Sequence, residues 1–241
     1  MNEFIDKING DDVYVDIGCS TPDTTDSLPS SIIKQSKSSL LIEYNSGKFK
    51  QTDSFYSNFS NVKVLNESVT PNNIVNLIKD NLQSDHKNIK LLDLDIDGYD
   101  YFVLKSILEN LKPKAICSEI NEKIPPPVRF AVKYDKDYKW DNSHFYGYSM
   151  QTGYDLCLEF GYKLCAFDFP NILMIRNDID VGVNIEPKEL YSKYYIEKGY
   201  PKSKSHNLNV IHFLDEKPLE EKIKDINKFY SKYQGRFILH K

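Results

Sequence analysis

The chain lacks the signals that would place it in a membrane, in a disulfide scaffold or on a nucleic acid. No apolar run approaches the roughly 20 residues of a membrane-spanning helix, and the start of the chain has no apolar signal core. The four cysteines form no C-x-x-C pair, which suits free thiols in a reducing compartment. With 31 basic and 35 acidic side chains, the net charge is -4 and gives no general attraction to nucleic acid or anionic membrane. We therefore predict a cytoplasmic protein with no nucleic-acid partner and no membrane partner.

Glycine-rich phosphate-binding loops are also missing. The first β-rich run, Val13 to Ile17, is followed by Gly18 alone, where a dinucleotide-binding sheet would show G-x-G-x-x-G. Glu43 ends the second β-rich run, and an acid in that position can accept hydrogen bonds from both ribose hydroxyls. A single glycine with a ribose-binding acid suits an adenosine ligand that has no phosphates. S-adenosylmethionine is such a ligand.

What the sequence does contain is a regular alternation of strands and helices. Five β-rich runs alternate with segments that are expected to be helical, at residues 13–17, 39–43, 61–65, 89–94 and 114–118. One of these helices is short and is expected at about residues 30–35. Two further strands form a hairpin after a helix, at residues 162–167 and 172–175. This order predicts an α/β, Rossmann-like fold with a mostly parallel seven-stranded sheet, an antiparallel edge strand and helices on both faces.

Breaks in this alternation predict the domain organisation. We expect one Rossmann-like domain over residues 1–180, with a substrate loop inserted at residues 121–147. Three successive prolines from Pro125 exclude a helix interior or a central strand there, and the aromatic side chains that follow argue against disorder. Residues 181–241 are expected to form a helical extension packed on the same domain. Its amphipathic helix at 218–233 offers either packing or a homodimer contact.

Polar residues follow all five strands of the alternation. They are Asp16 and Gly18, then Glu43, then residues 66–68, then Asp95 and Asp97, and finally Glu119 and Asn121. Because ligands of parallel sheets bind at the carboxyl ends of the strands, these residues are expected to line one cleft.

The stretch from Leu91 to Asp100 carries three acids, Asp93, Asp95 and Asp97, on one face of a strand. We place Asp95 and Asp97 in the cleft. Asp93 lies deeper in the strand, so we leave it out of the site and expect it to cap a loop or to pair with a cation.

Three segments carry a family resemblance: Val13–Gly18, Leu91–Leu104 and Ser118–Asn121. Together they are similar to the FkbM-type S-adenosylmethionine-dependent methyltransferases. Residues 125–177 also resemble a subgroup found near sugar and surface-polysaccharide genes. The resemblance covers about residues 13–177 and implies a class I methyltransferase fold.

The resemblance also implies which residues bind the cofactor. Asp16, Gly18 and Ser20 would contact the methionine end, and Glu43 would contact the ribose. Glu67 and Ser68 would lie beside the adenine, and Asp95 would lie near the sulfonium. The implied acceptor is a small molecule or a saccharide, and the implied reaction is O-methylation of a sugar or of a polysaccharide or glycoconjugate precursor.

A hydroxyl acceptor loses its proton as it attacks the methyl group, which calls for a nearby carboxylate or histidine. The candidates are Asp97, Glu119 and His144. The residues expected to contact the substrate are Asn121, Arg129, Tyr138, Trp140 and Tyr146, whose aromatic members could form a wall against a sugar face.

Two alternatives stay open. In the first, Asp95, Asp97 and Glu119, with His144, bind Mg²⁺ or Mn²⁺ through hard ligands, and the protein is a metal-assisted O-methyltransferase of another small molecule. In the second, the chain is a non-catalytic binding or scaffold protein, because its first loop lacks a second glycine and carries Pro22.

Overall fold

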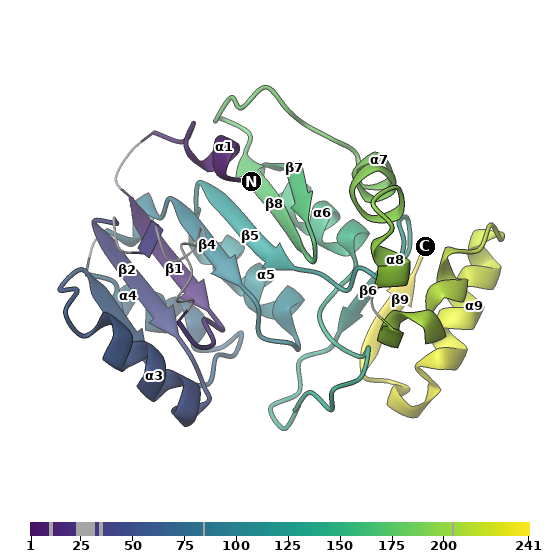
Figure 1. Cartoon of the computed structure of the whole chain (residues 1–241), viewed down its shortest axis with the longest axis horizontal. Coiled ribbons are helices and arrows are strands. Elements are labelled where there is room, and N and C mark those ends of the chain that lie inside the picture. The colour runs from purple at the N-terminus through teal and green to yellow at the C-terminus, as the bar shows by residue number, and fades with distance from the viewer. Residues whose placement is uncertain (10–11, 23–31, 34–35, 84, 204) are drawn as a thin grey trace. The chain divides into compact units, whose positions relative to one another are not determined.

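The computed structural model describes residues 1–9, 12–22, 32–33, 36–83, 85–203 and 205–241. Seven strands form one sheet in the order β3-β2-β1-β4-β5-β8-β7 (Figure 1). β1 to β5 pair in parallel, and β7 and β8 form an antiparallel pair at one edge. With helices around the sheet, this arrangement confirms the predicted Rossmann-like class I methyltransferase fold. The short helix expected at residues 30–35 falls largely outside the described residues.

The chain divides into two compact units. Unit 1 comprises Met1–Ile96 and Val103–Ser118, and unit 2 comprises Asp97–Phe102 and Glu119–Lys241. Each unit has its own buried core and its own candidate site residues.

Unit 1 holds the parallel strands. They are β1 (Val13–Ile17), β2 (Ser38–Ile42), β3 (Val62–Leu65), β4 (Leu91–Leu94) and β5 (Ala115–Glu119). All five residues of β2 are buried, as expected for a strand covered on both faces. The helical segments that begin in unit 1 are α1 (Asn2–Ile5), α3 (Ser46–Tyr56), α4 (Ile74–Asn81) and η1 (His86–Asn88), and α5 (Asp100–Asn110) lies mostly in this unit.

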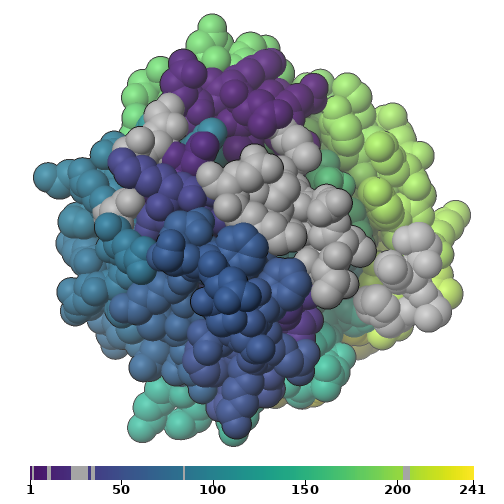
Figure 2. Space-filling model, turned by 60° about the vertical axis from the view of Figure 1, so that its left-hand side comes forward, coloured from purple at the N-terminus to yellow at the C-terminus, as the bar shows by residue number. Residues whose placement is uncertain are grey.

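Local sequence explains where the helices of unit 1 begin. The Asn45 side chain accepts hydrogen bonds from the N–H groups of Gly47 and Lys48 and so caps α3. α3 lies at the surface of unit 1, coloured blue in Figure 2, and most of its side chains are exposed. α4 turns Ile74 and Ile78, which are four residues apart, into the core.

Unit 2 contains the hairpin and most of the short helices. Its strands are β6 (Arg129–Val132), β7 (Tyr162–Asp168), β8 (Asn171–Arg176) and β9 (Phe237–His240). Its helices are α6 (Met150–Glu159), α7 (Pro187–Tyr191), the π-helix η2 (Ser192–Ile196), α8 (Tyr200–Ser203), η3 (Ser205–Asn209), η4 (Ile211–Leu214), α9 (Leu219–Phe229) and η5 (Ser231–Tyr233). The predicted hairpin is confirmed as β7 and β8, and the predicted helix before it as α6.

The pair β6–β9 is not predicted by the sequence analysis. The two strands are antiparallel, with Arg129 opposite His240 and Val132 opposite Phe237. An aromatic cluster packs beside them, in which the rings of Phe145 and Tyr233 stack with centroids 3.8 Å apart. The segment at residues 121–147 therefore contains a strand, and residues 181–241 supply its partner. Of the helices in the described part of the chain, none combines the length and apolar character needed to cross a bilayer.

Candidate functional site

Gly18 is required by a close approach of two backbones at the end of β1. A Cβ atom on Gly18 would lie 1.7 Å from the backbone oxygen of Asp95, and its φ of +89° is one that L side chains rarely adopt. Nearby, the Asp95 N–H donates to the Ile17 carbonyl at 2.9 Å. The glycine singled out in the first motif thus lets the end of β4 lie directly against the turn after β1.

Glu43 organises the loop that follows Gly18. The side chain is only 3% exposed. Its Oε2 accepts a hydrogen bond from the Ser20 N–H at 2.9 Å, and its Oε1 accepts one from the Asn45 N–H at 2.7 Å. Thr52 Oγ1 donates to the Ser20 carbonyl at 2.7 Å. A carboxylate has about four acceptor positions, so Glu43 fixes this loop and still has acceptor capacity for ribose hydroxyls.

Left-handed backbone occurs at a few non-glycine residues of the described chain. Ser20, Asp97 and Asn142 have φ values of 57°, 53° and 60°. Such conformations cost free energy and cluster at functional sites. Two of these residues, Ser20 and Asp97, are sites predicted from the sequence, and the third lines the cavity of unit 2 described below.

Two part-buried acids are neighbours in the sheet of unit 1. Asp16 and Asp93 are register partners on β1 and β4, and the Tyr14 hydroxyl donates to Asp93 Oδ2 at 3.4 Å. Burial raises the pKa of Asp93 to about 6. The pKa of Asp16 is raised well above its usual range by burial and by the charges of Asp93 and Asp95. Asp93, left out of the site because of its depth, therefore lies beside a predicted cofactor residue.

The two residues assigned to the adenine, Glu67 and Ser68, follow β3 and are exposed. The Ser68 carbonyl accepts a hydrogen bond from Asn73 Nδ2 at 2.9 Å, which ties this turn to the residue before α4. Their place beside the adenine stays a prediction.

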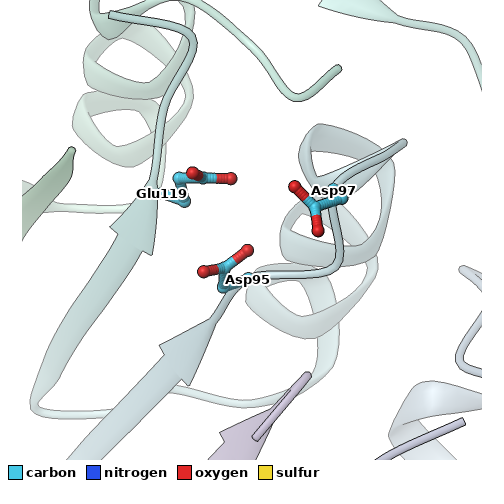
Figure 3. A group of neighbouring side chains, drawn as sticks. All are labelled: Asp95, Asp97 and Glu119. Atoms are coloured by element: carbon cyan, nitrogen blue, oxygen red, sulfur yellow. The ribbon is translucent and has the colours of Figure 1, made fainter. Parts of the chain in front are cut away.

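Three carboxylates gather where β4 and β5 end. Figure 3 shows the carboxylates of Asp95, Asp97 and Glu119 directed toward one another. One oxygen of each lies within 4.8 Å of the others. Asp97 and Glu119 belong to unit 2, and Asp95 precedes Asp97 by two residues. Hard oxygen donors of this kind suit Mg²⁺ or Mn²⁺. Exposed acids commonly gather without an ion, so the metal stays a prediction.

Unit 2 contains a cavity of about 800 Å³. Five of the residues singled out in the sequence line it: Asp97, Glu119, Trp140, His144 and Tyr146. The remaining lining residues are Glu122, Lys123, Asn142, Ser143, Phe169, Pro170, Asn209, Phe229, Tyr230, Lys232 and Tyr233. The volume is in the range of small-molecule sites.

Three predicted substrate contacts do not line the cavity, and two of them, Asn121 and Tyr138, support the chain around it. Asn121 Nδ2 donates to the carbonyls of His144 and Tyr146 at 2.8 and 3.0 Å. The Tyr138 hydroxyl contacts the carbonyl of Asp97 at 3.1 Å. Arg129 Nε pairs with Asp155 Oδ2 at 2.5 Å. Their direct contact with a substrate stays a prediction.

His144 is held by hydrogen bonds on both its ring and its backbone. Its Nε2 lies 2.9 Å from Asn209 Oδ1, and because that oxygen only accepts, Nε2 carries the hydrogen. The His144 carbonyl accepts from the Tyr230 hydroxyl at 2.7 Å. Nε2 is therefore not the atom that could take a proton from an acceptor.

A buried charged group in the cavity wall, the Glu122–Lys123–Tyr146 network, is not predicted from the sequence. Lys123 Nζ lies 2.9 Å from Glu122 Oε1 and donates to the Tyr146 hydroxyl, which donates to Glu122 Oε2 at 3.1 Å. Glu122 is 1% exposed and Lys123 is 6% exposed. Burial and the charge of Glu122 raise the pKa of Tyr146 well above its usual range, so its phenol keeps its proton. The signal was available, because both charged residues directly follow Asn121 at the end of the fifth strand.

The second group of missed residues comes from the end of the chain. Phe229, Tyr230, Lys232 and Tyr233 line the cavity, although the amphipathic pattern of this helix predicts only packing or a homodimer contact. The pattern gives the buried face of a helix but does not show that one end of that face borders a cavity.

No protein-family model and no curated protein matches the sequence. Among solved structures, a putative S-adenosylmethionine-dependent methyltransferase from Listeria monocytogenes is similar at 10% identity, with 73% of this chain and 95% of that chain covered and a TM-score of 0.45. An rRNA methylase from Streptococcus thermophilus is similar at 11% identity, with 72% of this chain and 90% of that chain covered and a TM-score of 0.41. The methyltransferase FkbM from Methylobacillus flagellatus is similar at 16% identity, with 56% of this chain and 43% of that chain covered and a TM-score of 0.35. Likeness at this level carries no argument about activity.

Proposed function

We propose that this chain is an S-adenosylmethionine-dependent methyltransferase whose cofactor residues lie in unit 1. The observation that carries the proposal is the geometry after β1 and β2. There, Gly18 permits contact with the Asp95 backbone, while the buried Glu43 holds the Ser20 N–H. This arrangement offers a carboxylate for ribose hydroxyls, and the sequence has no glycine-rich pyrophosphate-binding loop. Asp16, Gly18 and Ser20 would hold the methionine end, with Glu67 and Ser68 near the adenine.

Bound S-adenosylmethionine supplies a methyl group on a positively charged sulfur. The acceptor oxygen forms the new bond to that carbon as the carbon–sulfur bond breaks, and the electron pair stays on sulfur. Because such a displacement requires in-line geometry, positioning provides much of the rate. Asp97 and Glu119 line the unit 2 cavity, so either carboxylate is placed to take the acceptor's proton.

His144 has a different role in this proposal from the one the sequence indicates. Its ring is tied to Asn209 and its carbonyl to Tyr230 and Asn121. We assign it to positioning the loop that carries Trp140 and Tyr146.

A saccharide hydroxyl is the proposed acceptor. The Trp140 side chain is 40% exposed and lines the cavity, which leaves an aromatic surface against which the C–H face of a sugar can pack. Carboxylates and an ammonium group in the same wall provide acceptors and donors for ring hydroxyls.

Isothermal calorimetry of the full chain with S-adenosylmethionine tests the proposal. We expect a saturable heat and a rise in melting temperature, and S-adenosylhomocysteine should compete. A chain that shows neither heat nor thermal shift is not a methyltransferase of this kind, and the scaffold alternative would then stand.

A further inference from the structure

We infer that the unit 2 cavity selects an uncharged polyhydroxyl ring over an anionic sugar, and that Lys123 and Glu122 bind one of its hydroxyls. The inference rests on the proposed function for one point, namely that the bound ring is the methyl acceptor. The selection itself rests on contacts within unit 2.

The Glu122–Lys123–Tyr146 network places a donor next to an acceptor. An ammonium group has three N–H donors, and the contacts of Lys123 with Glu122 and Tyr146 use two of them. Each carboxylate oxygen of Glu122 accepts one hydrogen bond in this network, from Lys123 or from Tyr146, and each retains a second lone pair. A hydroxyl group donates and accepts at once, so it matches such a pair better than a group that only accepts.

Burial holds these groups in place. The side chains of Lys123 and Glu122 are 5% and 2% exposed, and the Lys123 ammonium also lies 4.7 Å from the centre of the Tyr146 ring. Breaking a buried ion pair is strongly unfavourable, because it leaves an uncompensated charge out of water. A phosphate or carboxylate would therefore have to bind the third N–H of Lys123 beside the Glu122 carboxylate, whose negative charge repels it.

The other charges of the cavity also disfavour an anion. Its lining has three carboxylates, on Asp97, Glu119 and Glu122, against two ammonium groups, on Lys123 and Lys232. Both lysines have carboxylate neighbours, since Lys232 Nζ lies 3.3 Å from Asp141 Oδ2. An anionic ligand would therefore enter a negative field.

Trp140 supplies the surface for the ring and also a way to observe it. Its Nε1 donates to the Ser143 carbonyl at 2.8 Å, and its ring meets the Tyr146 ring edge-on with centroids 6.2 Å apart. These contacts fix the indole while much of it stays exposed. Trp140 is the single tryptophan of the chain, so the intrinsic tryptophan fluorescence reports on this cavity alone.

The test is a fluorescence titration of the full chain, in EDTA, with neutral hexoses and their charged counterparts. The neutral probes are glucose, galactose, mannose and rhamnose, and the charged probes are glucose 6-phosphate, glucuronic acid and glucosamine. We expect saturable binding of at least one neutral hexose, about tenfold or more tighter than the anionic sugars. Equal or tighter binding of an anionic sugar overturns the inference, and so does the absence of binding by all neutral hexoses. Glucosamine that binds tenfold tighter than every neutral hexose also overturns it, in favour of an amine-bearing ligand.

A double variant, Glu122→Gln with Lys123→Met, tests the role of the network. It removes both buried charges together and leaves neither unpaired. We expect a folded protein by circular dichroism that binds the neutral hexose about tenfold more weakly. Tyr146→Phe keeps both charges and removes only the hydroxyl, so it tests the network if the double variant does not fold. We expect Tyr146→Phe to bind the neutral hexose about three- to tenfold more weakly. Unchanged hexose affinity in the folded double variant, or in Tyr146→Phe when the double variant does not fold, overturns the assignment.

Calorimetry with S-adenosylmethionine separates this inference from the proposed function. Retained cofactor binding without hexose selection overturns the inference alone. Hexose selection without cofactor binding overturns the methyltransferase proposal and leaves a sugar-binding cavity. Trp140→Phe controls for the signal, because it should abolish the fluorescence change while hexose contacts persist in saturation-transfer NMR.

Discussion

Asp16 and Asp93 lie directly opposite each other in the register of two adjacent parallel strands. Burial is the main reason that both pKa values are raised, and for Asp16 the charge of Asp93 adds to the effect. An acid that is harder to ionise in the folded than in the unfolded chain stabilises the fold only while it is protonated. This pair therefore makes the stability of the protein depend on pH.

The contribution of this pair to the free energy of unfolding should fall as the pH rises. For Asp93, the stabilisation is complete below the unfolded pKa near 3.8 and is lost as the pH passes the folded value of about 6. Asp93→Asn should remove much of this fall and raise stability at neutral pH by about 1 kcal/mol or more, while its amide oxygen still accepts from Tyr14. Urea unfolding across this pH range gives the measurement, with the exposed Asp53→Asn as the matched control. A neutral-pH loss of stability in Asp93→Asn would contradict the assignment.

Gly18→Ala should be far more damaging than another glycine substitution at similar backbone geometry. Gly161 has a φ of +84° and no atom within 4 Å of the place that an added Cβ would take, whereas Gly18 has a φ of +89° and the Asp95 oxygen at 1.7 Å. Gly161→Ala reports the conformational cost, on the order of 1–3 kcal/mol. Gly18→Ala adds the steric conflict and should also abolish cofactor binding. Equal losses in the two variants, measured by chemical unfolding, would show that the close approach does not matter.

Glu43→Gln should weaken the binding of S-adenosylmethionine. The amide nitrogen of glutamine cannot accept, so either the Ser20 or the Asn45 N–H loses its partner and the charge offered to the ribose is gone. We expect a loss of about 1.5–3 kcal/mol, the range for hydrogen bonds to charged groups. Calorimetry measures it, with the exposed Glu109→Gln as the control in the same unit. Unchanged affinity would exclude Glu43 as the ribose ligand.

Asp97→Asn should separate binding from methyl transfer. Asparagine tolerates the left-handed φ of 53° found at this position, so the backbone should keep its path. Cofactor affinity should stay the same, while transfer to a saccharide acceptor slows by about 10²- to 10⁴-fold if Asp97 is the general base. Glu119→Gln, assayed in parallel, identifies the base if Asp97→Asn turns over normally.

Tyr233→Phe should loosen the loop that carries Trp140 without removing any side chain of the sugar wall. The Tyr233 hydroxyl bonds Asp141 Oδ2 at 2.6 Å and Ser143 Oγ at 2.8 Å, and the phenylalanine keeps the stacking with Phe145. We expect about 1 kcal/mol less stability and stronger quenching of the tryptophan by acrylamide. Tyr44→Phe, at a residue 75% exposed, is the control. Quenching equal to that of the control would show that this hydroxyl does not anchor the loop.

The sequence predicts the sheet of this protein well because its strands are short apolar runs that end in polar residues. Gly18, Glu43 and Asp97 can be predicted as site residues because each comes shortly after the end of one of these strands. β6 and β9 escape prediction because each gains its structure from a partner that lies about a hundred residues away in the sequence. Periodicity is a local property and cannot reveal such a pairing.

The missed site residues have a related explanation. Adjacent charges such as Glu122 and Lys123 are most often solvated on a surface. Here the Tyr146 hydroxyl and the Tyr191 hydroxyl, which donates to the Glu122 carbonyl at 2.6 Å, help to enclose them. Only the tertiary structure brings these tyrosines to the pair.

The pairing of β6 with β9 also sets the order of events while the protein is being made. The segment that contains Arg129 leaves the ribosome long before its partner His240 has been added, so until then the edge of β6 that pairs with β9 is hydrogen-bonded to water instead. Unit 1 contains no residue beyond Ser118, so all of it has been made well before β9. Contacts over such a span are slow to form, and the unfinished edge of β6 is the place where a nascent chain would be most open to chaperones or to wrong strand partners.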